Sequence, residues 1–393
     1  MKITSVETIP VSLPVGDFAD GFSKVGAVQP TPRFAQGRSS RHRYAPGHEP
    51  RIVLSNVIVK IHTDEGITGI GEAACDTTEP VRSVQNMIDR YMAPTLIGEN
   101  PLDWEFLIDR VSWDAPRGAT RFATSGIDLA LHDLVGKALG VPIYALLGGY
   151  RREKVLASIE VPKNTPKLQL EHCVEYYEQG IRGFKLKVGS NPYLDAESVV
   201  SARERFGSEV SLRVDANCGY TVKEARTFCR IIEQSGVDLE VLEQPVAKLD
   251  LEGLRAVRDS TDIPVEADES AFSLGMVYKL LAAGAVDLVN TKCAKASGIK
   301  GVREWATVAR AADTGVVIGT EWGCAGIVAA KLHLGAALVN ADPVVEFTEI
   351  MIHELLHREP IVLEDGYIRV PTSPGLGMEL DEDKVERFRL PGA

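Results

Sequence analysis

The sequence lacks the marks of a membrane protein, of a nucleic-acid-binding protein and of a disulfide-stabilised secreted domain. No apolar run approaches the roughly 20 residues needed to cross a bilayer. Acidic residues outnumber basic ones by 55 to 43, and a net charge of −12 would repel nucleic acids and anionic membranes. The six cysteines are scattered without a Cys-x-x-Cys pair, which indicates reduced thiols rather than disulfides or a zinc site.

Two further absences narrow the location and the fold. The first residues, Met1–Val6, alternate like a strand and lack the apolar core of a signal peptide, so we expect a cytoplasmic protein. No glycine-rich phosphate loop follows any predicted strand, which disfavours an open, doubly wound nucleotide-binding sheet. What the chain does have is length, because 393 residues can hold one large domain or two ordinary ones with ample core.

Residues 1–125 are predicted to form a small α+β domain. Strands are expected over 2–13 and 53–62, a third strand after Gly66, and helices over 79–97 and 101–111. The loop 15–50 between the first two strands is rich in Gly, Pro, Ser and Arg, which is typical of a functional lid or of disorder. Its basic residues Arg41 and Arg43 suit an anionic ligand, with a solvated surface loop as the alternative.

Residues 126–363 alternate between strand and helix patterns. Seven helical segments separate eight predicted strands, at 155–161, 183–189, 210–217, 239–245, 263–270, 286–293, 316–322 and 344–350. This alternation is typical of a parallel barrel, and the open doubly wound sheet is the second choice. The tail 364–393 carries a short strand pattern and is expected to return to the N-terminal domain. The fold class is therefore α/β, with a TIM-like barrel capped by an α+β domain.

The predicted C-terminal ends of five successive barrel strands carry charged residues in register. They read Lys187, Asp215, Glu243, Asp268 and Lys292, spaced 24 to 28 residues apart. Barrel enzymes hold their chemistry at this end. Three converging carboxylates repel one another unless a cation lies between them. Oxygen ligands without His or Cys select a hard ion, ordinarily Mg²⁺, with Mn²⁺ as the alternative. Each acid taken singly is more commonly a capping residue, so the shared register carries the prediction.

Two lysines alternate on the second barrel strand. Lys185 and Lys187 share one face, because residues i and i+2 of a strand point the same way. Two ammonium groups that lie close together repel, which makes the neutral amine of either easier to reach. We therefore interpret Lys187 as an acid/base residue and Lys185 as a residue that lowers its pKa. Lys295, three residues after Lys292, is expected to be solvated.

This set of residues predicts proton transfer next to a carboxylate. A divalent ion can hold a substrate carboxylate and neutralise the charge that forms when the neighbouring proton leaves. Lys187 and Lys292 would act as base and acid on opposite faces. Racemisation, epimerisation, elimination of water and cycloisomerisation all remain open. A non-catalytic barrel that binds metal and ligand is a remote alternative, and a metal-dependent aldolase or hydrolase leaves the two opposed lysines unexplained.

The motifs around these residues resemble the enolase superfamily, in particular its muconate cycloisomerase (muconate lactonizing enzyme) subgroup. The segments that carry the resemblance are Lys185–Lys187, Asp215–Asn217, Glu243–Pro245, Asp268–Ser270, Asn290–Lys292, Gly71–Glu72 and Leu146–Gly149. The resemblance implies a (β/α)7β barrel, a homo-oligomer, and a small-molecule carboxylate as substrate. It further implies Asp215, Glu243 and Asp268 as metal ligands and Lys187 and Lys292 as the acid/base pair of an ene-diolate reaction. Mandelate racemase-type members place a histidine on the seventh strand, where this chain has Thr320–Trp322.

The substrate is less well defined by the sequence. Glu321 and Trp322 on the seventh strand, with Glu346 or Glu349 on the eighth, suit a cationic amine as part of an anionic and aromatic wall. Asn217 shares a face with Asp215 and is a candidate for binding near the metal. The Asp-x-Asp pattern of dipeptide epimerases is absent from the eighth strand. The basic loop instead suits a second carboxylate, as in muconate. Muconate and an N-substituted amino acid both stay open, with a betaine or a hydroxyproline-like substrate of a dehydratase as the alternative.

Overall fold

The structure is a computed structural model, and it describes residues 1–14, 53–75, 81–114, 121–351 and 354–391. The N-terminal part is a three-stranded antiparallel sheet in the order β1 (Ile3–Pro14), β2 (Val53–Thr63), β3 (Thr68–Ala74). Helices accompany the sheet: α2 (Val81–Met87), the π-helix η1 (Ile88–Met92), α3 (Ala93–Leu96), the 3₁₀ turn η2 (Pro101–Asp103), α4 (Trp104–Asp114) and α5 (Arg121–Leu139). Arg41 and Arg43, and the rest of loop 15–50, lie outside the described residues.

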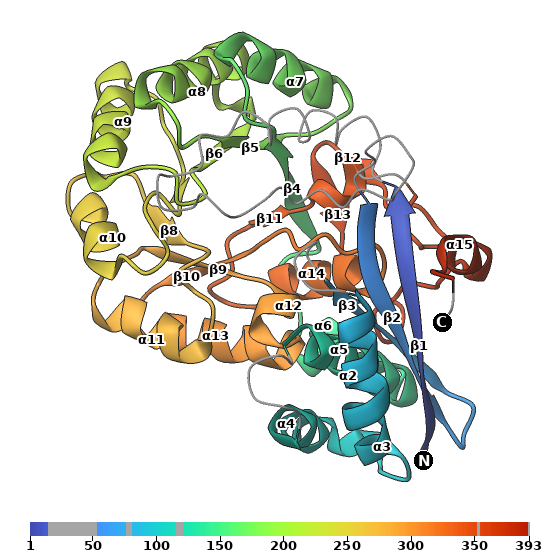
Figure 1. Cartoon of the computed structure of the whole chain (residues 1–393). Helices are drawn as coiled ribbons and strands as arrows, with labels where there is room; N and C mark the ends of the chain where they lie inside the picture. The colour runs from blue at the N-terminus through green and yellow to red at the C-terminus, as the bar shows by residue number, and fades with distance from the viewer. Residues whose placement is uncertain (15–52, 76–80, 115–120, 352–353, 392–393) are drawn as a thin grey trace.

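Glycine explains how closely the long helix α5 packs on this sheet. A side chain at Gly71 on β3 would clash with the backbone carbonyl of Gly126, and one at Gly69 would clash with that of Ala130. The two glycines therefore let α5 lie directly against β3. Helix α5 is buried on nearly all sides, because it also contacts α12 and α13 of the barrel. It joins the small sheet to the rest of the molecule (Figure 1).

Eight parallel strands follow and form a ring. They are β4 (Lys154–Val161), β5 (Gly183–Lys187), β6 (Ser211–Asp215), β7 (Leu242–Glu243), β8 (Val265–Ala267), β9 (Leu288–Thr291), β10 (Gly315–Ile318) and β11 (Val344–Glu346). Each strand pairs with the next from β4 to β10, and β11 pairs with β4. A backbone bridge between Val316 and Ala341 completes the ring between β10 and the segment before β11. The α/β barrel with an N-terminal α+β unit is confirmed.

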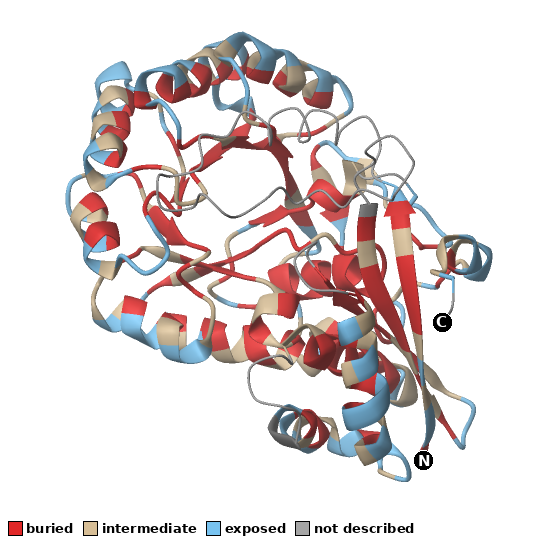
Figure 2. Ribbon diagram, in the orientation of Figure 1, coloured by how far each residue is buried: buried red, intermediate tan, exposed pale blue. Residues whose placement is uncertain are grey.

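The remaining helices of this part of the chain lie before, between and after these strands. They are α6 (Ile143–Leu146), α7 (Pro166–Glu178), α8 (Pro192–Phe206), η3 (Gly207–Glu209), α9 (Val222–Ser235), α10 (Leu251–Arg258), α11 (Leu274–Ala282), α12 (Cys293–Ala296), α13 (Ile299–Ala311), α14 (Gly326–Ala337) and η4 (Thr348–Met351). The outer helices are buried on the side that faces the strands and exposed on the other (Figure 2). Helix α14 differs, because every residue in it is buried between the barrel and the N-terminal unit.

The C-terminal tail contacts both parts of the molecule. Its strand β13 (Tyr367–Arg369) pairs antiparallel with β4 of the barrel and with the short β12 (Leu363–Glu364). Helix α15 (Glu382–Phe388) instead packs against β1, and Leu390 donates a backbone hydrogen bond to Pro10. The domain boundary near residue 125 stays a prediction. None of the described helices is long and apolar enough to cross a membrane.

Several barrel strands are shorter than the sequence predicted. The segment predicted as a strand over 239–245 contains only the two-residue strand β7. Asn217 and Gln244, which follow β6 and β7, have φ values of 41° and 36° and so leave the extended conformation. The charged residues of the sequence pattern consequently lie at the last position of a strand or one residue beyond it.

Candidate active site at the barrel mouth

The two lysines of β5, Lys185 buried and Lys187 partly buried, are paired with carboxylates. Lys187 Nζ lies 2.6 Å from Asp215 Oδ2 and 2.8 Å from Glu160 Oε1. Burial lowers the pKa of Lys187, but Asp215 and Glu160 outweigh it and hold the pKa above its ordinary value. Lys185 acts in the predicted, lowering direction, yet its effect is smaller than that of the carboxylates. In this arrangement the carboxylates therefore outweigh the lowering effect on the pKa of Lys187 that was predicted for Lys185.

Lys185 is paired more extensively than its neighbour. Its Nζ lies 2.9 Å from Glu243 Oε2, 2.8 Å from Glu346 Oε1 and 3.5 Å from Glu160 Oε1. Burial lowers the pKa of Lys185, and the three glutamates together raise it well above its ordinary value. Lys185 therefore neutralises a buried group of acids in addition to repelling Lys187.

Lys292 lies across the barrel from Lys187. It follows β9, which is four strands away from β5 in either direction around the ring of eight. Lys292 Nζ lies 2.8 Å from Asp268 Oδ2, and its pKa is raised because Asp268 and Glu243 outweigh burial. Each lysine of the predicted pair thus contacts one of the predicted ligand carboxylates.

Lys295 is not solvated, contrary to the expectation from the sequence. Its Nζ lies 2.6 Å from Asp268 Oδ1 and donates hydrogen bonds to the carbonyls of Asn290 and Asp268. Lys292 and Lys295 therefore hold the two oxygens of Asp268, which keeps the pKa of this carboxyl far below its usual range despite burial.

The three predicted ligands are all buried at the mouth of the barrel. Asp215 ends β6, Glu243 ends β7 and Asp268 follows β8. Burial and the nearby charge of Asp215 raise the pKa of Glu243 well above its ordinary value. A divalent cation fits this chemistry, because it would relieve the repulsion between carboxylates that lie on neighbouring strands.

A second group of acids shares Glu243 with the predicted set. Carboxylate oxygens of Glu243, Glu266 and Glu346 all lie within 4.8 Å of one another, and all three residues are buried. Strand register explains the group, because Glu243 on β7 pairs with Glu266 on β8 rather than with Asp268. Burial raises the pKa of Glu266 to about 8, so this acid is mostly uncharged at neutral pH. With Lys185 paired to the other two, this deeper group is already largely balanced in charge.

Two acids in these networks were missed by the sequence prediction. Glu266 lies two residues before Asp268 on the same face of β8, and this period of two was the available signal. Glu160 lies on β4, where it contacts both lysines of β5. Its pKa is lowered to about 2, because Lys187 and Lys185 outweigh burial.

The predicted substrate wall is largely occupied by internal contacts. Glu346 pairs with Lys185 and accepts a hydrogen bond from the backbone of Thr320. Glu321 is buried and accepts hydrogen bonds from the backbone amides of Cys293 and Ala294. The roles of Glu321 and Glu346 as substrate contacts stay predictions, although both carboxylates already make internal contacts.

Trp322 and Asn217 are held by other polar groups. The carbonyl of Trp322 accepts a hydrogen bond from Asn56 of the N-terminal sheet, and its φ of 58° is left-handed. The side chain of Asn217 donates to Glu269, 3.3 Å away, and its backbone N–H donates to Asp215. Their roles as substrate contacts stay predictions.

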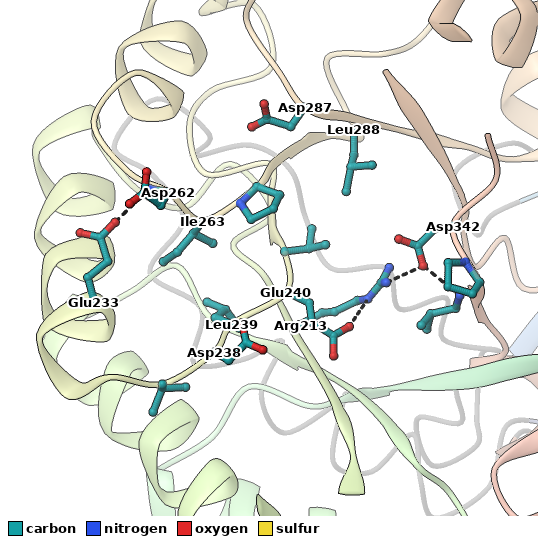
Figure 3. Close-up of a pocket in the computed structure, with 15 residues that line it drawn as sticks. Arg213, Glu233, Asp238, Leu239, Glu240, Asp262, Ile263, Asp287, Leu288 and Asp342 are labelled. Atoms are coloured by element: carbon teal, nitrogen blue, oxygen red, sulfur yellow. Dashed lines mark hydrogen bonds and ion pairs between the residues drawn. The ribbon is translucent and has the colours of Figure 1, made fainter. Parts of the chain in front are cut away.

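A large cavity lies at the opposite end of the barrel. It has a volume of about 690 Å³ and is lined by residues that precede the strands, including Leu239, Ile263 and Asp287. Arg213 points toward Glu240 and Asp342 at its edge (Figure 3). Because parallel strands place their C-terminal ends at the other face, this cavity is separate from the lysines and acids described above.

Known proteins resemble the chain along most of its length. The family described as "Mandelate racemase / muconate lactonizing enzyme, N-terminal domain" matches residues 51–148, and "Enolase C-terminal domain-like" matches residues 169–384. An L-Ala-D/L-Glu epimerase of Clostridium acetobutylicum is 33% identical over 83% of this chain and 91% of that protein. Muconate cycloisomerase 1 of Pseudomonas putida is 32% identical over 84% of this chain and 90% of its own. The crystal structure of N-succinyl Arg/Lys racemase from Bacillus cereus superposes with a TM-score of 0.84 at 25% identity, covering 99% and 98% of the two chains.

Proposed function

The chain belongs to the mandelate racemase/muconate lactonizing enzyme family and is an isomerase of the enolase superfamily, and we propose which residues carry its reaction. Lys187 and Lys292 exchange a proton with the carbon next to a substrate carboxylate, one from each face. The supporting observation is their placement four strands apart in a ring of eight, each within 2.8 Å of a carboxylate. Proton transfer on both faces of the substrate carbon requires one acid/base group on each face.

Family membership implies a divalent metal ion, and we propose Mg²⁺ with Asp215, Glu243 and Asp268 as its ligands. Bound there, the ion supplies positive charge for the enolate oxygen that forms when the proton leaves. We prefer these three acids to the group of Glu243, Glu266 and Glu346, because Lys185 and a proton on Glu266 already balance that group.

The carboxylate partner of each lysine determines whether that lysine can deliver or accept a proton. In the arrangement described, Asp215 keeps Lys187 protonated and Asp268 keeps Lys292 protonated, which suits proton delivery. Proton abstraction needs a neutral amine, so one lysine must lose the support of its carboxylate. Because the same carboxylates are the proposed metal ligands, we expect metal binding and lysine deprotonation to be coupled.

We propose racemisation or epimerisation of an N-substituted amino acid as the reaction. Lys187 and Lys292 lie on opposite sides of the ring of strands and each is paired with a carboxylate, which suits proton transfer on either face of the α-carbon. The internal contacts of Glu321 and Glu346 leave no support for an anionic pocket that would select a free amine. The N-succinyl Arg/Lys racemase, with a TM-score of 0.84, acts on an amino acid of this kind.

The test is proton exchange in deuterated water. The enzyme with Mg²⁺ is incubated with N-succinyl-L-lysine, N-succinyl-D-lysine and L-Ala-L-Glu, and deuterium at the α-carbon is followed by NMR. Lys187→Ala should abolish exchange with one enantiomer and Lys292→Ala with the other. Exchange that survives both substitutions would overturn the two-lysine mechanism. With a β-hydroxy acid added to the panel, loss of its hydroxyl group to give an unsaturated or keto acid would indicate a dehydratase.

Cycloisomerisation is the second candidate. It is favoured by the relationship to muconate cycloisomerase 1 of Pseudomonas putida, at 32% identity over 84% of this chain. Adding cis,cis-muconate to the same panel separates the two, because lactone formation consumes muconate and can be followed by its ultraviolet absorbance. Turnover of muconate that needs only one of the two lysines would favour this candidate.

A further inference from the structure

Glu321 is hydrogen-bonded to the backbone next to Lys292. It follows strand β10 by three residues and is 2% exposed. Its Oε1 accepts a hydrogen bond of 2.8 Å from the backbone N–H of Cys293, and its Oε2 accepts one from Ala294. These two amides belong to the residues that immediately follow Lys292 in the chain.

The backbone at Lys292 needs an external support. Lys292 is the residue before helix α12, with φ −141° and ψ 143°, and its side chain makes no capping hydrogen bond. Helix α12 has only four residues, so it cannot hold its own first turn, and its first N–H groups lack acceptors within the helix. Glu321 supplies both acceptors, which leaves the side chain of Lys292 free to extend toward Asp268.

The backbone of Glu321 is in turn held by a buried ion pair. Its backbone N–H lies 3.3 Å from Glu349 Oε1, and both oxygens of Glu349 accept hydrogen bonds from Lys331, at 2.7 and 2.9 Å. Lys331 and Glu349 are fully buried. A continuous chain of buried polar contacts therefore runs from helix α14 through Glu321 to the start of α12. The charged side chains in this chain of contacts are all shielded from water.

We propose that Glu321 is a positioning residue that aims the amino group of Lys292 at the substrate carbon. This inference rests on the proposed function in one respect, the assignment of Lys292 as an acid/base residue. Glu321 touches neither Lys187 nor any of its partners described above. Its loss should therefore impair the proton transfer made from the face of Lys292 and spare the transfer made from the opposite face.

The test compares the two faces in one protein. Deuterium exchange is measured with N-succinyl-L-lysine and N-succinyl-D-lysine for the wild type, Lys292→Ala, Glu321→Ala and Glu321→Gln, all with Mg²⁺. Lys292→Ala identifies the enantiomer that depends on Lys292. Glu321→Ala should slow exchange of that same enantiomer by about a hundredfold, the usual effect of a 1 Å misplacement, and that of the other by much less. Glu321→Gln keeps one acceptor oxygen and should fall between.

Asp250→Ala is the matched control. Asp250 caps the outer helix α10 by accepting a hydrogen bond from Gly253, so its loss removes a carboxylate cap far from Lys292 in the sequence. It should leave the ratio of the two exchange rates unchanged. Equal slowing of both enantiomers by Glu321→Ala would contradict a positioning role and indicate general damage to the fold.

A second measurement does not depend on catalysis. Backbone hydrogen exchange by mass spectrometry should show the amides of Cys293 and Ala294 protected in the wild type and in Asp250→Ala, and exposed in Glu321→Ala. If the wild type exchanges neither enantiomer, the proposed function fails while this measurement still decides the structural role of Glu321. Unchanged protection in Glu321→Ala would overturn the inference in either case.

Discussion

Replacing Lys185 by methionine removes an ammonium group from among several buried acids. Lys185 is 3% exposed, and its Nζ lies 2.9 Å from Glu243 and 2.8 Å from Glu346. Breaking a buried ion pair from one side costs about 3–5 kcal/mol, because the remaining carboxylates are left buried without a partner. Lys185→Met should therefore lower the free energy of unfolding by about that amount.

The expected change in melting temperature follows from the size of the protein. An unfolding entropy of about 2.1 cal/mol/K per residue gives about 0.8 kcal/mol/K for 393 residues that unfold together. A loss of 3–5 kcal/mol then lowers Tm by about 4–6 °C, measured by scanning calorimetry. The matched control is Lys167→Met, because the Lys167 side chain is 86% exposed and its ion pair with Glu171 is long at 3.8 Å. Its stability should change by less than about 0.5 kcal/mol.

A double variant isolates the cause. Lys185→Met with Glu346→Gln removes one of the unpaired charges and should restore part of the lost stability. The same single variant should move the onset of exchange activity to higher pH, because Lys185 lowers the pKa of Lys187. If Lys185→Met melts at the temperature of Lys167→Met and keeps the wild-type pH profile, the reasoning about this buried charge is refuted.

Two further predictions concern the acids. The folded-state pKa of Glu266 is raised from 4.5 to about 8 by burial, so its contribution to stability is full below pH 4.5 and is lost as the pH rises through 8. Glu266→Gln should therefore reduce the loss of stability between pH 5 and pH 9, on the order of a few kcal/mol, in urea titrations at each pH. Asp215→Asn should weaken Mg²⁺ binding by at least about tenfold in calorimetry, and equal affinity would contradict the proposed ligand role.

The position of the candidate site could be predicted from the sequence because barrel geometry is repetitive. Each βα unit returns the chain to the same face, so charged residues at strand ends, such as Asp215 and Glu243, must lie near one another. The positions of these charged residues along the barrel axis were harder to predict. Glu243 pairs with Glu266 rather than with Asp268, and this register depends on the stagger between neighbouring strands.

The partners of each charged group were the least predictable feature. The sequence shows that Glu321 and Glu346 follow or end strands, but it does not show that a backbone amide or a lysine already occupies each carboxylate. Lys295 was misjudged for a related reason, since the short helix α12 returns its side chain to Asp268. Such pairings depend on side chains from other strands, which no local pattern encodes.

Glu321 is one of several buried side chains that hold the backbone at or just after a proposed catalytic or metal-binding residue. Asp195 accepts hydrogen bonds from the amides of residues 189–191, two to four positions after Lys187. Gln244 accepts hydrogen bonds of 3.0 Å from the amides of Asp268 and Ser270. In each case a single side chain accepts two or more hydrogen bonds from backbone amides. This side chain belongs to a neighbouring segment of the barrel mouth or to the same loop. Because loops would otherwise be the most mobile part of the barrel, these contacts explain how residues at or beyond the strand ends can hold a fixed geometry.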